Sequence, residues 1–231
     1  MSTIRLEDTT RGPLTSSGTK HRVFEGPFSY YRTFGVGVDI FVFDTPSVDA
    51  DCTLDEYDRW LDEQYEHIEG LRAKDAVLIL LPTDRKGHPW SKSVATASSA
   101  MSHGWQLFRH FVWLKQEADF HRSQYAFQDV WTFRKGSRAT NGDAEARYKD
   151  VVRILMPHDA DSHVGALPSI VIEYFLALWA KAGDLVMDPF AGRGSVMEAA
   201  HTLGLGSISC ELDPERAEHL RQMSRALEGN E

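Results

Sequence analysis

A loop near the end of the chain has the residue types and spacing of a nucleotide-binding site. Residues 188–195 read Asp-Pro-Phe-Ala-Gly-Arg-Gly-Ser and follow the predicted strand 184–187. Gly192 and Gly194 allow the backbone to turn tightly and let a ligand approach without a Cβ in the way. Asp188, at the carboxyl end of the predicted strand, is placed to accept a hydrogen bond from a ligand ammonium or hydroxyl group.

A second acidic residue follows at the end of the next predicted strand, residues 206–210. Glu211 stands there, and an acidic side chain in that place can accept hydrogen bonds from both hydroxyls of a ribose. The pattern is not the dinucleotide fingerprint, because the third glycine is missing, and there is no P-loop lysine. The alternative is a glycine-bearing turn followed by a surface acid. We favour a ligand site because both features occur at the spacing that one ligand requires.

These residues resemble the S-adenosylmethionine motif of the amino-methylating DNA methyltransferases, which are the adenine-N6 and cytosine-N4 enzymes of restriction-modification systems and phages. The resemblance implies S-adenosylmethionine as cofactor and DNA as partner. It also implies that Asp188 or its loop lies near the methionine amino group and that Glu211 holds the ribose. The implied cofactor-binding residues are Asp188, Pro189, Phe190, Ala191, Gly192, Gly194, Ser195, Glu211, Leu212 and Asp213, with His163 and Pro168 from a segment that closes over the methionine end.

In one branch of this family the catalytic motif precedes the cofactor motif, and this chain is similar over roughly residues 36–227. The family's catalytic tetrapeptide is Asp/Asn/Ser-Pro-Pro-aromatic, and Asp44-Thr45-Pro46-Ser47 occupies its place. In the family, a side-chain oxygen and a backbone carbonyl hydrogen-bond the target amine and direct its lone pair at the methyl group. The aromatic ring stacks on the flipped base, which contributes about 1–3 kcal/mol.

The tetrapeptide of this chain keeps the polar groups and lacks the ring. Asp44 supplies the side-chain oxygen, the Thr45 carbonyl supplies the second acceptor, and Pro46 stiffens the loop. Ser47 cannot stack on a base, so a ring from another part of the sequence would have to replace it. The candidates for that ring are Tyr30, Tyr31, Phe34 and Trp90.

Three functions stay open at this point. The first, which the resemblance favours, is methyl transfer to an exocyclic amino group of a DNA base; by the same resemblance, Asp at position 44 favours adenine-N6 over cytosine-N4. The second is methyl transfer to RNA, a modified nucleotide or a small molecule. The third is a catalytically degenerate member that binds cofactor or nucleic acid only.

The charge distribution bears on the DNA partner. The formal net charge is -9, yet the stretch from Asp84 to Arg153 holds 12 Lys and Arg against 7 Asp and Glu. Within it, Arg134, Lys135 and Arg138 are candidate phosphate contacts, and a solvated surface loop is the alternative. The candidate target-recognition segment, about 116–156, is short. A long recognition sequence is therefore not expected unless two subunits of a homodimer share the reading.

The predicted elements place both motifs on one scaffold. Strands are predicted at 38–43, 76–81, 105–113, 129–133, 184–187 and 206–210, and helices at 54–73, 91–102, 168–182, 192–203 and 214–227. Thr53 and Glu56 form a capping box at the start of the helix 54–73. Strands alternating with helices of this length predict an α/β, Rossmann-like methyltransferase fold with a mostly parallel sheet and helices on both faces.

Length and composition set the remaining expectations. The chain of 231 residues is 42% hydrophobic, which suits a single methyltransferase domain over 26–231 after a polar, flexible N-terminal arm over 1–25. No apolar run approaches the roughly 20 residues that span a bilayer, and the N-terminus lacks a signal peptide, so a cytoplasmic protein is expected. The ten histidines are scattered, and no metal site is expected.

Overall fold

The computed structural model describes residues 21–28, 37–45, 53–82, 91–114, 127–141, 150–154 and 167–229. The strands formed there are β1 (His21–Glu25), β2 (Val38–Phe43), β3 (Arg72–Leu80), β4 (Gln106–Leu114), β5 (Phe127–Arg134), β6 (Val151–Arg153), β7 (Leu185–Asp188) and β8 (Gly206–Glu211). The helices are α1 (Leu54–Leu71), α2 (Ser91–Ser102), α4 (Ser169–Ala177), α5 (Ser195–Thr202) and α6 (Pro214–Gly229).

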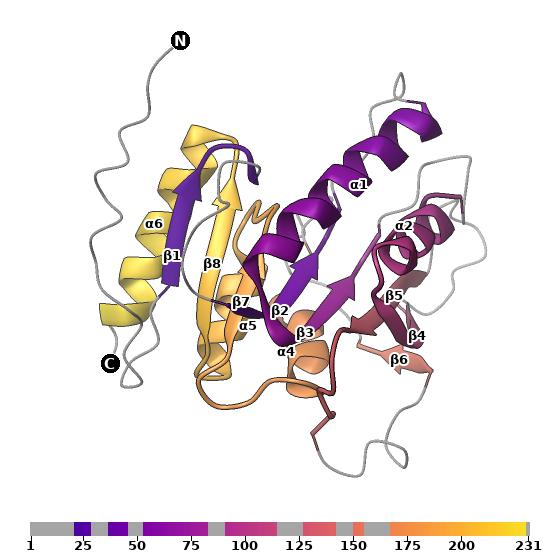
Figure 1. Ribbon diagram of the computed structural model, residues 1–231. Helices are drawn as coiled ribbons and strands as arrows, with labels where there is room; N and C mark the ends of the chain where they lie inside the picture. Colours follow the sequence, from indigo (N-terminus) through magenta and orange to yellow (C-terminus); the bar gives the residue numbers. More distant parts are fainter. Residues whose placement is uncertain are drawn as a thin grey trace, which may run out of the picture.

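All these strands belong to one sheet, in the order β1-β8-β7-β2-β3-β5-β4-β6 (Figure 1). Neighbouring strands are parallel except where β5 pairs with β3 and with β4. All strands other than β5 therefore point in one direction. Their carboxyl ends meet at one edge of the sheet, which we call the carboxyl edge; the opposite edge is the amino edge.

Side chains of the central strand β2 alternate between two apolar cores. Phe41 and Phe43 lie in the core that α1 and α2 cover, while Ile40 and Val42 lie in the core that α4 and α5 cover. In Figure 1, α1 and α2 lie in front of the sheet, and α4 and α5 lie behind it. α6 packs beside α5, against β1 and β8. The predicted fold class, a mostly parallel sheet with helices on both faces, is confirmed.

The capping box predicted at the start of α1 is present. The hydroxyl of Thr53 accepts a hydrogen bond from the Glu56 backbone N–H at 3.3 Å, and the Glu56 carboxylate accepts one from the Thr53 backbone N–H at 2.9 Å. Tyr57, Leu61 and Tyr65 follow on the helix face that is buried against the sheet. Because β2 ends at the carboxyl edge, α1 begins there with its capping box and runs back towards the amino edge.

Two strands were not predicted from the sequence, and one of them corrects the predicted arm. The last five residues of the arm 1–25 form β1, which pairs in parallel with β8; residues 1–20 lie outside the described ranges. β1 has only Val23 and Phe24 as apolar residues, and its partner strand lies far along the chain. β6, of three residues, pairs with β4 on the side away from β5. Neither strand carries a local pattern that reveals its partner.

The long helix predicted at 168–182 is shorter in the structure. Pro168 precedes it as the N-cap, and α4 ends at Ala177. The side-chain amide of Asn141 donates to the carbonyl oxygens of Ala177 and Ala180, at 3.0 and 2.6 Å. A side chain from another part of the chain thus satisfies carbonyls at the helix end, where a longer helix would have used its own N–H groups. No helix of the described residues combines the length and apolarity needed to cross a membrane.

Candidate active site

The carboxyl edge brings together three acidic side chains that are far apart in the sequence. Asp44 follows the end of β2, Asp188 is the last residue of β7, and Glu211 is the last residue of β8. β8, β7 and β2 are neighbours in the sheet, and Asp188 pairs in register with Ser209 of β8. The three acids therefore lie at the ends of adjacent strands.

The strand order reverses between β7 and β2. From β7 the chain continues through α5 to β8 on one side, whereas from β2 it continues through α1 to β3 on the other. α5 and α1 also cover opposite faces of the sheet, so the loops after β7 and β2 separate at this point. In open α/β sheets, ligands bind in the crevice at such a reversal. Asp188 and Asp44 flank that position.

The loop between β7 and α5 makes a tight turn in which two glycines have positive φ. These angles are 51° at Gly192 and 90° at Gly194, and the Gly194 N–H donates to the Ala191 carbonyl at 2.8 Å. A Cβ on Gly194 would lie 2.6 Å from Cδ2 of Leu220 in α6. A Cβ on Gly192 would have its nearest neighbour at 3.8 Å. Gly194 thus packs closely on α6, while Gly192 leaves room beside the backbone.

The Glu211 carboxylate joins this loop to the loop after β8. Its Oε2 accepts a hydrogen bond from the Gly192 N–H at 2.8 Å, and its Oε1 accepts one from the Asp213 N–H at 2.9 Å. A carboxylate has about four acceptor positions, so Glu211 can still accept hydrogen bonds from ligand hydroxyls. Leu212 beside it is 68% exposed. The Asp213 side chain has a structural contact, because it accepts a hydrogen bond from the Arg216 N–H of α6 at 2.9 Å.

Asp188 is buried at the centre of the site. Its Oδ1 accepts a hydrogen bond from the Phe190 N–H at 2.9 Å, and the side chain is 4% exposed. Burial raises the pKa of Asp188 to about 8; the hydrogen bond opposes this rise, and the nearby charges of Asp44 and Glu211 add to it. A carboxylate in this position is stabilised by any cation that comes close, because a cation relieves both the desolvation and the repulsion.

The segment before α4 lies against the glycine loop. The Ser195 hydroxyl donates a hydrogen bond to the Leu167 carbonyl oxygen, directly before Pro168. The structure therefore brings two of the predicted cofactor residues, Ser195 and Pro168, close together. Of the other predicted residues in the loop, Pro189 and Ala191 are buried. His163 lies outside the described residues.

The loop that would receive the methyl acceptor, which we call the acceptor loop, begins with Asp44 and Thr45. Asp44 is partly buried and Thr45 is 1% exposed. The Asp44 charge is close enough to raise the pKa of both Asp188 and Tyr57. The rest of the predicted catalytic motif and the rings considered as replacements lie outside the described residues; these are Pro46, Ser47, Tyr30, Tyr31, Phe34 and Trp90.

A sequence profile of the DNA methylase family matches residues 38–222, so both loops lie within the match. The chain belongs to the N6/N4 DNA methylase family. This family depends on S-adenosylmethionine, as the resemblance of the glycine loop implied. No curated protein sequence matches the chain at a significant level.

Solved structures of DNA methyltransferases share the fold of this methylase. The PvuII DNA methyltransferase, which is cytosine-N4-specific, superposes with a TM-score of 0.72 and 14% identity, over 93% of this chain and 94% of that one. The complex of M1.HpyAVI with S-adenosylmethionine gives 0.67 and 14%, over 88% and 99%. A protein of Thermus thermophilus, provisionally named a DNA modification methylase and complexed with S-adenosyl-L-methionine, gives 0.66 and 15%, over 91% and 94%.

The methylase also has an aromatic contact that the sequence did not reveal. Trp60 of α1 is partly buried, and its ring packs between Phe190 of the glycine loop and Tyr57 of the same helix. Its ring centroid lies 5.3 Å from that of Phe190 in the glycine loop and 5.6 Å from that of Tyr57, with which it stacks. Phe190 in turn contacts Phe43 edge-on at 5.5 Å. The only signal in the sequence is the position of Tyr57 and Trp60 in the first turns of a helix that follows the acceptor loop.

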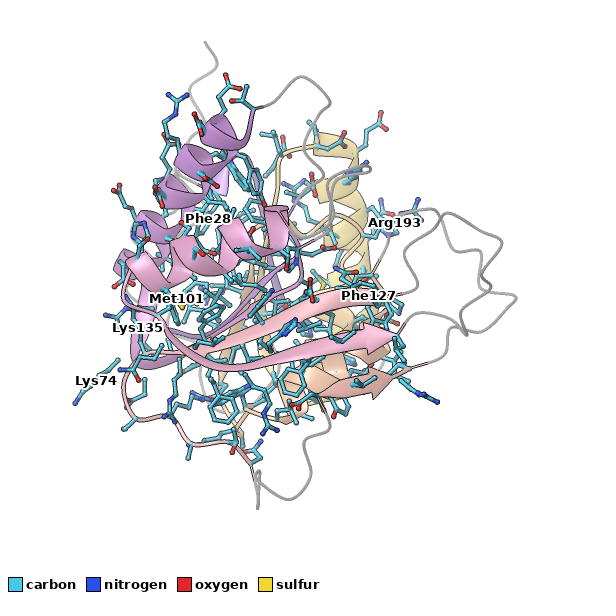
Figure 2. The ribbon with its side chains drawn as sticks, turned by 90° about the vertical axis from the view of Figure 1, so that its right-hand side faces the viewer. Phe28, Lys74, Met101, Phe127, Lys135 and Arg193 are labelled. Carbon is cyan, nitrogen blue, oxygen red and sulfur yellow. The ribbon has the colours of Figure 1, made fainter. Side chains whose placement is uncertain are left out.

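The three basic residues predicted to contact phosphates are not brought to the site. They follow or end β5 at the amino edge, and Figure 2 shows Lys135 at the opposite end of the methylase from Arg193 of the glycine loop. Arg138 is 6% exposed, pairs with Asp184 and donates to the Trp179 carbonyl oxygen at 3.1 Å.

The other two basic side chains also have partners within the fold. Lys135 pairs with Glu69 and lies 5.2 Å from the centroid of the Trp105 ring. Arg134 lies over the Phe108 ring, at 5.6 Å. Among all the described residues, the site included, no group of three His, Cys, Asp or Glu side chains is arranged to hold a metal ion.

Proposed function

We propose that this methylase transfers the methyl group of S-adenosylmethionine to an exocyclic amino group of a DNA base, and that adenine-N6 is favoured over cytosine-N4. The observation that carries the proposal is the position of Asp44 at the strand-order reversal, beside Asp188 and one strand further from Glu211. An acceptor held by Asp44 would lie next to a cofactor held by the two other acids. The preference for adenine rests on the aspartate at position 44.

The residues of the glycine loop suit this cofactor. The raised pKa of Asp188 marks a buried carboxyl group that a ligand ammonium would stabilise in its ionised form. Glu211 has acceptor positions left for the two ribose hydroxyls. The exposed Leu212 offers an apolar surface for the base of the cofactor. The open side of Gly192 allows the ligand to approach the backbone closely.

We expect the acceptor loop to promote methyl transfer by orienting the target amine. S-adenosylmethionine supplies a methyl group on a sulfonium, which is already an activated leaving group. The Asp44 carboxylate accepts a hydrogen bond from one hydrogen of the target amine and the Thr45 carbonyl accepts one from the other, which directs the nitrogen lone pair at the methyl carbon. Asp44 is also the base within reach of the proton that the methylated nitrogen releases. Alignment of two bound reactants removes most of the entropic part of such a barrier.

The test is transfer of labelled methyl groups from S-adenosylmethionine to duplex DNA, single-stranded DNA and RNA, with the product nucleosides identified by mass. Transfer to a DNA amino group is expected, and Asp44→Ala should reduce it at least about 100-fold with little change in cofactor affinity. Asp188→Ala should instead weaken cofactor binding. Undiminished transfer by the Asp44 variant contradicts the role of Asp44. Transfer to RNA alone, or to no nucleic acid, contradicts the proposed function.

A further inference from the structure

Trp60 of α1 lies between a buried side chain of its own helix and the glycine loop. The Tyr57 ring, which is 4% exposed, stacks on the Trp60 ring, with centroids 5.6 Å apart and an interplanar angle of 29°. The Tyr57 hydroxyl lies 3.4 Å from the Thr96 hydroxyl of α2, so Tyr57 contacts both helices that cover the front of the sheet (Figure 1). On the other side, the Trp60 ring lies 5.3 Å from the Phe190 ring. A line of packed rings therefore connects the core to the glycine loop.

Phe190 is the residue of the glycine loop that hydrogen-bonds Asp188. Its backbone N–H donates to Oδ1 of Asp188 at 2.9 Å. Pro189 stands between the two residues, and its ring fixes its own φ. The direction of the Phe190 N–H also depends on the ψ angle of Pro189, which the proline ring does not fix. The hydrogen bond to Asp188 therefore depends on what holds the Phe190 side chain.

In the described part of the chain, two rings pack against the Phe190 ring. Phe43 at the end of β2 contacts it edge-on, with centroids 5.5 Å apart and planes at 77°. Phe43 is completely buried, so its position is fixed together with the strand. Trp60 makes the second contact, with planes at 39°. Without Trp60, Phe190 would keep only the edge contact, and its backbone could turn the N–H away from Asp188.

We propose that Trp60 is a positioning residue for cofactor binding: its ring holds the Phe190 side chain, and thereby keeps the Phe190 N–H directed at the Asp188 carboxylate. Trp60 touches no part of the cofactor in this scheme and acts through Phe190 alone. The inference rests on the cofactor role of Asp188 in the proposed function, because this hydrogen bond matters for binding only if Asp188 meets the ligand ammonium.

The hydrogen bond from Phe190 favours the ionised form of Asp188. Burial raises the pKa of Asp188 to about 8, the charges of Asp44 and Glu211 add to the rise, and the hydrogen bond opposes it. The other titratable group beside Asp188 in the described chain is the Cys210 thiol, whose own pKa is raised by burial and by the Asp188 charge. Loss of the hydrogen bond would therefore raise the pKa of Asp188 further, and less of the carboxyl group would be ionised to attract an ammonium.

The test is the Kd for S-adenosylmethionine of the wild type and of Trp60→Leu at a series of pH values. The ratio of the two Kd values cancels the ionisation of the ligand itself. We expect the variant to bind about 3-fold more weakly at pH 7, where much of Asp188 is protonated, and less than about 1.5-fold more weakly at pH 9, where the carboxylate is ionised in both proteins. Trp60→Phe keeps a ring against Phe190 and should stay within about 1.5-fold of the wild type throughout. A ratio for Trp60→Leu that does not change with pH overturns the positioning role.

Trp105→Leu is the matched control. Trp105 lies in the same core, is 2% exposed and contacts Phe41 edge-on at 6.4 Å, but it directly precedes β4 at the amino edge. This variant should lose at least as much stability as Trp60→Leu and bind S-adenosylmethionine with the wild-type Kd at every pH. If Trp105→Leu changes the ratio as Trp60→Leu does, the effect is one of general stability and the inference is overturned.

A double-mutant cycle of Trp60→Leu and Phe190→Leu tests the contact without a ligand. If the two rings support each other, the effects of the substitutions on the unfolding equilibrium constant should be non-additive by about 2- to 10-fold. An additive cycle overturns the inference whether or not the cofactor binds. A coupled cycle in a protein whose wild-type affinity does not change with pH upholds the contact, but contradicts the cofactor role of Asp188 and with it the positioning role.

Discussion

Asp188 combines burial with two acidic neighbours, and this combination makes its ionisation sensitive to what binds beside it. Its pKa of about 8 means that the folded protein without ligand keeps a proton on this carboxyl group over much of the neutral range. A cationic ligand group would favour loss of that proton. At the scale of single residues, cofactor binding and the protonation of Asp188 should therefore be linked.

The first prediction concerns this linkage. We expect the affinity for S-adenosylmethionine to rise with pH between about pH 6 and pH 8, approaching tenfold per unit, because only the ionised Asp188 attracts the ammonium. Titration calorimetry at several pH values measures it. Asp188→Asn should bind more weakly and lose this dependence. A wild-type affinity that stays constant over the range would contradict the assignment.

The sign of the effect on stability follows from the same raised pKa. Above the ordinary pKa of 3.8 the unfolded chain has lost the proton that the folded protein still holds. The contribution of Asp188 to the free energy of unfolding is therefore fully present below about pH 4 and is lost as the pH rises towards 8. Asp188→Asn should show a smaller decrease over that range.

The second prediction concerns the close packing of Gly194. A Cβ there would meet Cδ2 of Leu220 at 2.6 Å and Sδ of Met223 at 2.8 Å. Gly183 has nearly the same φ, 86°, but open space around it, so Gly183→Ala is the matched control. The control should be destabilised by about 1 kcal/mol from its backbone conformation, and Gly194→Ala by about 1 kcal/mol more. Urea unfolding measures both. Equal losses would mean that Leu220 and Met223 move aside without penalty.

At the scale of elements, the buried Arg138 side chain links three segments of the sheet. Arg138 follows β5, pairs with Asp184 just before β7, and lies 3.6 Å from Asp39 of β2. Burial raises the pKa of Asp39, and the charge of Arg138 counteracts part of that rise. The positive charge of Arg138 thus compensates the negative charges of Asp39 and Asp184 at the amino edge. The same two strands, β2 and β7, lead to the site at the carboxyl edge.

Removing that arginine gives the third prediction. Arg138→Ala should lower the free energy of unfolding by about 3 kcal/mol, because it leaves acidic groups without their partner in a buried place. DNA affinity should not change. The control is Arg134→Ala, whose cation lies over an aromatic ring at the partly exposed edge and which should lose about 1 kcal/mol or less. A large loss of DNA affinity with little loss of stability would restore the phosphate-contact hypothesis for Arg138.

The contrast between Arg138 and α1 explains what the sequence can and cannot predict. The capping box of Thr53 and Glu56 is a local pattern, and it is found as predicted. The glycine loop is a contiguous motif, so a single sequence is enough to propose it as a cofactor site. The contacts of Arg138 and the approach of Trp60 to Phe190 depend on which strands are neighbours. That order is decided by pairing over long separations, and single-sequence patterns do not contain it.

At the scale of the whole molecule, we expect DNA to bind at the carboxyl edge of the sheet and not at the amino edge. In the proposed reaction a DNA base approaches the cofactor at the carboxyl edge. Figure 2 shows Arg193 and Phe127 at that end of the molecule, and Lys74 and Lys135 at the other. Arg193 is exposed within the glycine loop, and Lys74 is also exposed, near the start of β3. Because the net charge of the protein is -9, an exposed cation beside the site reduces the local electrostatic repulsion of a polyanion such as DNA.

The fourth prediction tests this division. Arg193→Gln should weaken DNA binding and reduce the slope of log affinity against log salt by about one, as expected for the loss of one phosphate contact. Lys74→Gln removes the same charge at the amino edge and should leave the slope unchanged. Binding is measured by fluorescence anisotropy over a series of salt concentrations. The reverse result would place the DNA on the amino edge and contradict the proposed approach.

The pairing of β1 with β8 also affects the order in which the protein is assembled during translation. β1 is the first described strand to leave the ribosome, yet its partner strand and α6, which packs on it, are among the last. The cofactor half of the sheet therefore cannot close until residues 206–229 have emerged. The half formed by β2, β3, β4 and β5 can pair earlier, since its strands are closer in sequence. A nascent chain should thus gain its acceptor loop well before it can hold a cofactor, and a translation product truncated before β8 should be unable to bind one.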